Sequence, residues 1–149
     1  GIMIGLAGMV FNGVFDRYPN LRVAFLEGGV AWFLMALERF TGSYNGFRPY
    51  DPRGEYLKLR GGETVADYVI RHARAGRIAV GVEGDEPALT YAVKVAGREA
   101  FIYSSDFPHE VNVDSVRHEI DELLENDELS AEDKAAILHG NSARFYGFH

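Results

Sequence analysis

Three short apolar segments, each followed by acidic residues and then by a helix-like stretch, constrain the fold of this chain most strongly. They cover residues 21–26, 77–82 and 100–104. Near-continuous apolar runs of this length are typical of strands buried on both faces, as in parallel sheets covered by helices. Parallel strands need crossover connections, and the helix-like stretches supply them. The sequence therefore predicts an α/β fold built from three parallel βα units.

Polar side chains gather directly after all three predicted strands. In parallel α/β folds the ligand site lies at the carboxyl ends of the strands, so these side chains should converge at one edge of the sheet. This placement is the main argument for a functional site. The residues are Glu27 after the first strand, Glu83, Asp85 and Glu86 after the second, and Asp106 and His109 after the third.

The segments around the strands carry helix signals. Apolar residues recur at helical spacing in residues 1–13, which predicts a buried helix. Residues 30–40 are almost wholly apolar and predict a second helix, followed by a turn-rich connection over residues 41–62. A later helix should bury one face made of Val65, Tyr68, Val69, His72 and Ala73.

Capping residues predict where the other helices begin. Thr64 with Asp67, and Ser130 with Asp133, have the spacing of N-terminal caps, and Asp114 is predicted to cap a further helix. The helix that begins at Ser130 is expected to end near Gly140.

The composition narrows the class of protein. With 149 residues, 47% apolar and 25% charged, residues 1–149 are expected to form a single globular unit. A net charge of −7 argues against a nucleic-acid partner. Cysteine is absent, so any metal must bind His, Asp or Glu, and the chain suits a reducing, cytoplasmic setting. The apolar start is shorter than the roughly 20 residues of a membrane span, so no membrane partner is expected.

Three segments resemble the amidohydrolase-related family. They are GVFDRYPNLRVAFLEGG at residues 13–29, YSSDFPH at residues 103–109 and ILHGNSARFYGF at residues 137–148. The similarity covers nearly the whole chain, and the segments occur in the family's order. The branch that this chain resembles contains aminocarboxymuconate-semialdehyde decarboxylase and related aromatic-acid decarboxylases.

The resemblance implies a metal-dependent (β/α)₈ TIM barrel, of which this chain looks like the carboxyl-terminal portion. Its strands would be the sixth to eighth, so we expect a partial barrel, because a whole one takes about 250 residues. The implied cofactor is a divalent metal ion, zinc or else manganese. The family's His-x-His pair is absent from the sequence, so this chain alone is not expected to complete a metal site.

The resemblance also implies roles for individual residues. Asp106 matches the family's eighth-strand Asp, which binds the metal or its water and acts as acid and base. Glu27 stands where the decarboxylase that names the branch has a His; it is a second candidate catalytic residue, or else it accepts backbone hydrogen bonds at the start of the next helix. His109 and Glu83 are candidate substrate-binding residues, although His109 can equally pair with a carboxylate and Glu83 can be a solvated loop residue.

Two functions of different kinds follow from these predictions. In the first, the chain is part of an enzyme that hydrolyses or non-oxidatively decarboxylates a small carboxylate or carbonyl substrate. In the second, it is a fragment or associating module without chemistry of its own. Open sheet edges and the apolar helix at residues 30–37 predict a homo-oligomer, or a missing amino-terminal half that covers them.

Overall fold

The three predicted strands form one parallel sheet. A computed structural model describes residues 1–48, 57–109 and 111–148. Its strands are β1 (Val23–Phe25), β2 (Ile78–Val82) and β3 (Phe101–Tyr103), hydrogen-bonded in the order β1-β2-β3. Both strand pairs are parallel, so the predicted α/β fold with a parallel sheet is confirmed.

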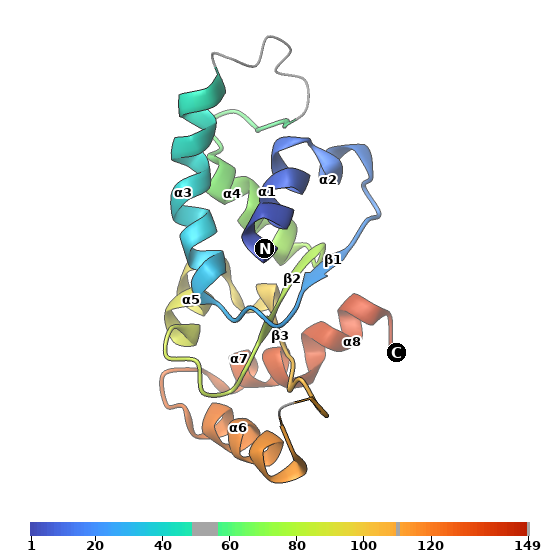
Figure 1. Cartoon of the computed structure of the whole chain (residues 1–149), viewed down its shortest axis with the longest axis vertical. Coiled ribbons are helices and arrows are strands. Elements are labelled where there is room, and N and C mark those ends of the chain that lie inside the picture. The colour runs from blue at the N-terminus through green and yellow to red at the C-terminus, as the bar shows by residue number, and fades with distance from the viewer. Residues whose placement is uncertain (49–56, 110, 149) are drawn as a thin grey trace.

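Helices connect the strands and pack around the sheet (Figure 1). The helix α3 and the pair α4 and α5 lie along one side of the molecule, and α6 lies beyond the loops that follow the strands (Figure 1). The helical elements are α1 (Ile2–Phe11), α2 (Val14–Arg17), α3 (Ala31–Phe47), α4 (Val65–Arg74), α5 (Leu89–Ala96), the 3-10 turn η2 (Arg98–Ala100), α6 (Val113–Glu125), α7 (Ala131–Ala135), the π-helical turn η3 (Ala136–Gly140) and α8 (Asn141–Tyr146).

The pairing register gives the sheet two unlike faces. Phe25, Val80 and Phe101 are paired neighbours on the three strands, and all belong to the hydrophobic core shared with the helices. Successive side chains of a strand point to opposite faces. The opposite face of β2 therefore carries only the small residues Ala79 and Gly81.

Aromatic side chains join α3 to the sheet. Phe33 meets Phe101 edge-on, with ring centroids 6.1 Å apart, and Trp32 lies 5.6 Å from Phe25. All four side chains are buried, and burial of each contributes about 1.5–3 kcal/mol. These contacts hold the start of α3 against the strands whose ends carry the predicted site.

Helix α4 buries the five residues that were predicted for its inner face, His72 among them. The His72 ring lies between Tyr68 and Phe15, with centroids 4.5 and 5.3 Å away. Arg77 Nη1 lies 3.0 Å from His72 Nδ1. Burial, followed by the positive charges of Arg71 and Arg77, lowers the pKa of His72 to about 4. His72 is therefore a neutral core residue.

Helix α3 is longer than predicted. It runs to Phe47, so the first seven residues of the predicted connection are helical. Phe11 packs against Phe40 at 5.3 Å and stacks on Tyr44 at 6.4 Å, so contact with α1 stabilises this last part of the helix. Packing here outweighs the low helix propensity of its two glycines, Gly42 and Gly46. Pro49 and Pro52 of the predicted connection lie outside the described residues.

Two other helix ends differ from the prediction. Asn112, not Asp114, caps α6: its side chain accepts hydrogen bonds from the amides of Asp114 and Ser115. The carboxyl-terminal helix does not end at Gly140. It passes through a π-helical turn and continues to Tyr146, because Asn141 is buried and donates hydrogen bonds to the backbone at Arg98 and Phe101.

Helix α1 is buried on one face only. Leu6 and Val10 are fully buried, whereas Ile4 is 72% exposed. The predicted helix is confirmed, but the prediction that it is buried holds for that one face. Across the part of the chain that the structure describes, no helix has the length and apolar character needed to cross a membrane.

Candidate active site at the carboxyl ends of the strands

The side chains predicted to converge at the ends of the strands do so. A small hollow lies where the three strands end, and three of the four candidate site residues line it. Its lining is Glu27, Gly29, Gly81, Val82, Glu83, Ser104 and Asp106. The lining comes from the end of β2 and from residues that follow each of the three strands, so the hollow exists only when the sheet is formed.

Glu27 and Asp106 share an unusual backbone conformation. Their φ angles are +58° and +54°, and they are the only non-glycine residues with positive φ among those described. A side chain in this region costs on the order of 1 kcal/mol or more. Strained backbone of this kind persists where the surrounding structure fixes it, and it clusters at active sites. Both candidate catalytic residues have this strained, left-handed backbone conformation.

Two glycines follow Glu27 because neither position has room for a side chain. A Cβ on Gly28 would lie 2.7 Å from Trp32 Nε1, and a Cβ on Gly29 would lie 2.5 Å from Glu86 Oε2. Gly29 also has a φ of +62°. The turn from β1 into α3 therefore packs closely against the Trp32 side chain at Gly28 and against the Glu86 carboxylate at Gly29.

Glu86 holds the start of α3. Its Oε2 accepts a hydrogen bond from the amide of Val30 at 2.6 Å, and its Oε1 accepts one from the amide of Glu83 at 2.9 Å. The sequence left open whether Glu27 binds the backbone at this helix start. Within the described residues that contact belongs to Glu86, which the sequence had placed only among the polar residues that follow the second strand. The Glu27 carboxylate is exposed and lines the hollow.

Asp106 pairs with His109 in the loop after β3. Asp106 Oδ1 lies 3.0 Å from His109 Nδ1, and the His109 amide donates to the Asp106 carbonyl at 2.9 Å. The His109 side chain is 71% exposed and the Asp106 side chain 31%. Of the two predicted alternatives for His109, the structure shows the pairing with a carboxylate. The His109 side chain is not part of the lining of the hollow.

Glu83 lies among carboxylates. Burial raises its pKa, and the negative charges of Glu119, Glu86, Asp85 and Asp106 raise it further. A carboxyl group in such surroundings holds a proton more readily than usual.

Helix α6 packs onto the edge of the site through Glu119. Tyr103, the last residue of β3, donates a hydrogen bond to Glu119 Oε2 at 3.2 Å. Burial and the nearby Glu119 raise the pKa of Tyr103, so its hydroxyl stays a donor. Gly84 approaches so closely that a Cβ on it would lie 1.8 Å from the Glu119 carbonyl oxygen. The loop after β2 therefore lies directly against α6.

The described residues do not supply a full set of metal ligands. No group of three His, Asp or Glu side chains is arranged to hold a metal ion in residues 1–48, 57–109 and 111–148. A catalytic zinc site uses three protein ligands. The residues gathered here, Asp106 above all, can provide only part of such a site.

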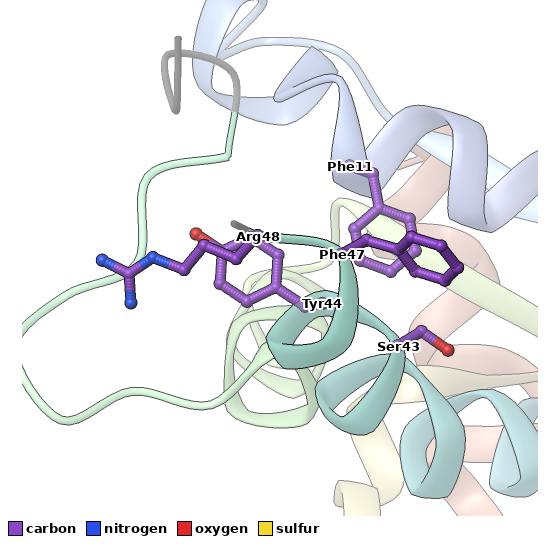
Figure 2. Close-up of a pocket in the computed structure, with 5 residues that line it drawn as sticks. All are labelled: Phe11, Ser43, Tyr44, Phe47 and Arg48. Atoms are coloured by element: carbon purple, nitrogen blue, oxygen red, sulfur yellow. The ribbon is translucent and has the colours of Figure 1, made fainter. Parts of the chain in front are cut away.

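A larger cavity lies elsewhere. Its volume is about 300 Å³, and it is lined by Phe11 and by the end of α3 at Ser43, Tyr44, Phe47 and Arg48 (Figure 2). Because α3 starts beside the carboxyl end of β1 and runs away from it, this cavity lies far from the strand ends (Figure 1). It contains none of the candidate site residues, so we place the candidate active site in the smaller hollow.

Parallel βα units with polar side chains after the carboxyl ends of the strands are the arrangement in which α/β folds, barrels among them, place their ligand sites. The comparison with protein families is more specific. The family model described as amidohydrolase matches residues 7–148. The chain belongs to the amidohydrolase family, as its three sequence segments had indicated.

One sequence relative and two solved structures of similar fold match nearly the whole of this chain. The chain is 27% identical to 2-amino-3-carboxymuconate-6-semialdehyde decarboxylase of Dictyostelium discoideum over 151 aligned residues, which cover 97% of this chain and 36% of that protein. An amidohydrolase of Mycobacterium avium subsp. paratuberculosis K-10 superposes with a TM-score of 0.71 at 22% identity, covering 97% of this chain and 33% of the other.

A third relative is 5-carboxyvanillate decarboxylase of Novosphingobium aromaticivorans, solved with bound manganese and 3-methoxy-4-hydroxy-5-nitrobenzoic acid. It superposes with a TM-score of 0.68 at 21% identity and covers 98% of this chain and 39% of that one. The chain thus spans between a third and two fifths of the length of these relatives.

Proposed function

We propose that this chain carries part of the active site of a metal-dependent amidohydrolase-family enzyme that decarboxylates or hydrolyses a small carboxylate or carbonyl substrate. Asp106 and Glu27 are the catalytic acid–base residues, and Glu83 and His109 bind the substrate. The chain corresponds to the carboxyl-terminal strands six to eight of the barrel.

One observation carries the proposal. Glu27 and Asp106 come from strands at opposite edges of the sheet, yet both line one hollow, and both hold a left-handed backbone that no other described non-glycine residue adopts. Residues held in this conformation cluster at active sites, so its occurrence at both carboxylates beside the hollow supports a catalytic role for each.

The residues suit proton transfer to and from a carboxylate substrate. In non-oxidative decarboxylation the bond between the carboxyl group and its neighbouring carbon breaks, CO₂ leaves, and that carbon takes up a proton. Asp106 or Glu27 supplies the proton as general acid. Glu83, which lines the hollow between them, is the proposed contact for the polar part of the substrate.

A divalent cation suits the oxygen-rich donor set of this hollow, and zinc or manganese is the proposed cofactor. The manganese bound to 5-carboxyvanillate decarboxylase supports that proposal. Asp106 is the proposed ligand from this chain. Because the described residues lack a third ligand, the acid–base roles proposed here rest on the side chains alone.

The test uses the full-length protein that carries this sequence. Release of CO₂ from a panel of small aromatic carboxylic acids is measured with added Mn²⁺ or Zn²⁺. Asp106→Asn should lower turnover by about 10²–10⁴-fold, the contribution of a general acid or base. Asp121→Asn is the matched control, because Asp121 is exposed on α6 and does not line the hollow. Wild-type turnover in Asp106→Asn would refute the proposal.

Glu27 is tested by two substitutions. Glu27→Gly removes the strain and should raise the free energy of unfolding by about 1 kcal/mol, while turnover falls. Glu27→Gln keeps the shape but cannot transfer a proton. If both variants kept full turnover, Glu27 would have no catalytic role.

A second candidate is an associating unit that has no chemistry by itself. The lack of three clustered metal ligands in the described residues favours it for the isolated chain. This candidate predicts that residues 1–149 alone form oligomers and release no CO₂. Turnover by the isolated chain would exclude it.

A further inference from the structure

We propose that Glu86 is a positioning residue that sets the geometry of the active site by holding two of its loops at once. The inference rests on the function proposed above and extends it to a residue that does not line the hollow. The loops are residues 26–30, which carry Glu27, and residues 83–86, which begin with Glu83.

The contacts are specific to the two oxygens of one carboxylate. Oε2 accepts from the Val30 amide at 2.6 Å, and Oε1 accepts from the Glu83 amide at 2.9 Å. Val30 follows β1 and Glu83 follows β2, so one side chain joins the ends of two neighbouring strands. The carboxylate also fills the space beside Gly29, where a Cβ would lie 2.5 Å from Oε2.

The two acceptor oxygens of a carboxylate of this length make both contacts. Glutamine has one acceptor oxygen, and its amide nitrogen is a donor that cannot receive an N–H. Aspartate keeps two acceptors but is shorter by one methylene. The start of α3 adds a reason for a negative charge, because its N-cap residue Val30 has no side chain that can cap it.

Loss of either contact would displace a site residue. Glu83 is itself the donor of one hydrogen bond, and Glu27 lies three residues before the donor of the other. Active sites are sensitive to such shifts, since a displacement of about 1 Å can lower turnover by about 10²-fold. Glu86 therefore acts on the reaction through Glu27 and Glu83 and not by touching the substrate.

The experiment compares Glu86→Gln with Asp85→Asn in the full-length protein. Both remove one negative charge near Glu83, but no hydrogen bond of the described residues uses the Asp85 side chain. In Glu86→Gln, hydrogen exchange at the Val30 or Glu83 amide should quicken by about tenfold or more, with other core amides unchanged. The kcat should fall by at least about tenfold. Asp85→Asn should leave exchange and kcat at wild-type values.

Several outcomes overturn the proposal. Unchanged exchange at both amides would show that Glu86 does not hold the loops. Faster exchange with unchanged kcat, or an equal kcat loss in Asp85→Asn, would show that the anchoring does not serve catalysis. If Glu86→Gln fails to fold, Glu86→Asp provides the same comparison with the charge retained. An inactive wild-type enzyme would refute the proposed function, whereas exchange would still decide whether Glu86 anchors the loops.

Discussion

Acidification from pH 7 to pH 5 should destabilise this protein through His72. The ordinary pKa of histidine is 6.5, and burial beside two arginines lowers that of His72 to about 4. Between these values the unfolded chain binds a proton that the folded chain excludes. Stability therefore rises with pH across this window and is lost as the pH falls below 6.5.

The magnitude follows from the two pKa values. A single histidine that titrates at 6.5 when unfolded and at about 4 when folded lowers the free energy of unfolding by about 2 kcal/mol between pH 7 and pH 5. The structure gives the cause: Arg77 Nη1 lies 3.0 Å from one ring nitrogen, and Arg71 Nη1 lies 3.5 Å from the other. A protonated ring would carry a third positive charge in this buried space.

Urea denaturation at pH 7, 6 and 5 measures the effect. His72→Gln removes the titrating group. The decrease in the free energy of unfolding between pH 7 and pH 5 should therefore be smaller by about 2 kcal/mol than in the wild type, even if the variant is less stable at pH 7. His118→Gln is the control, since His118 is 74% exposed in its pairing with Glu122. A pH dependence that is equal in the wild type and His72→Gln would refute this reasoning.

Two further substitutions test packing around the site. Gly84→Ala should weaken the docking of α6, because its Cβ would lie 1.8 Å from the Glu119 carbonyl oxygen. Gly46→Ala is the control, since a Cβ there meets nothing within 4 Å. The rate of proteolysis within α6 measures the difference, and equal resistance of the two variants would contradict the close approach. Asn141→Ala leaves the Arg98 and Phe101 carbonyls without the 2.7 Å hydrogen bonds from the Asn141 amide. It should lower the free energy of unfolding, measured by urea denaturation, by about 2–3 kcal/mol. A decrease well below about 1 kcal/mol would show that these carbonyls find other partners.

The parallel sheet could be predicted from the sequence because its signal is local. Each strand is an apolar run whose length and neighbours exclude a helix, and β2 is buried along all five residues. The ends of α3 and α6 were harder to predict. The end of α3 depends on Phe11, which lies far away in the chain. Asn112 and Asp114 are both good capping residues, so only the structure distinguishes them.

The outline of the site could also be predicted, because it depends on the direction of the strands. Strand direction alone places Glu27, Glu83 and Asp106 at one end of the sheet, and all three line the hollow. Glu86 was missed because its partner, the Val30 amide, is 56 residues away. One signal was present in the sequence: Glu86 stands three residues after Glu83, the spacing at which a side chain reaches back to a backbone amide.

The strand order also has a consequence for how the protein folds. Val80 pairs with Phe101 across 101 − 80 = 21 residues, whereas Val23 pairs with Ile78 across 78 − 23 = 55. Closing the longer loop costs about 0.9 kcal/mol more in chain entropy. We expect β2 and β3 to pair first, which brings Glu83 and Asp106 together. The strand that carries Glu27 then docks last, and only this late step brings Glu86 to the start of α3.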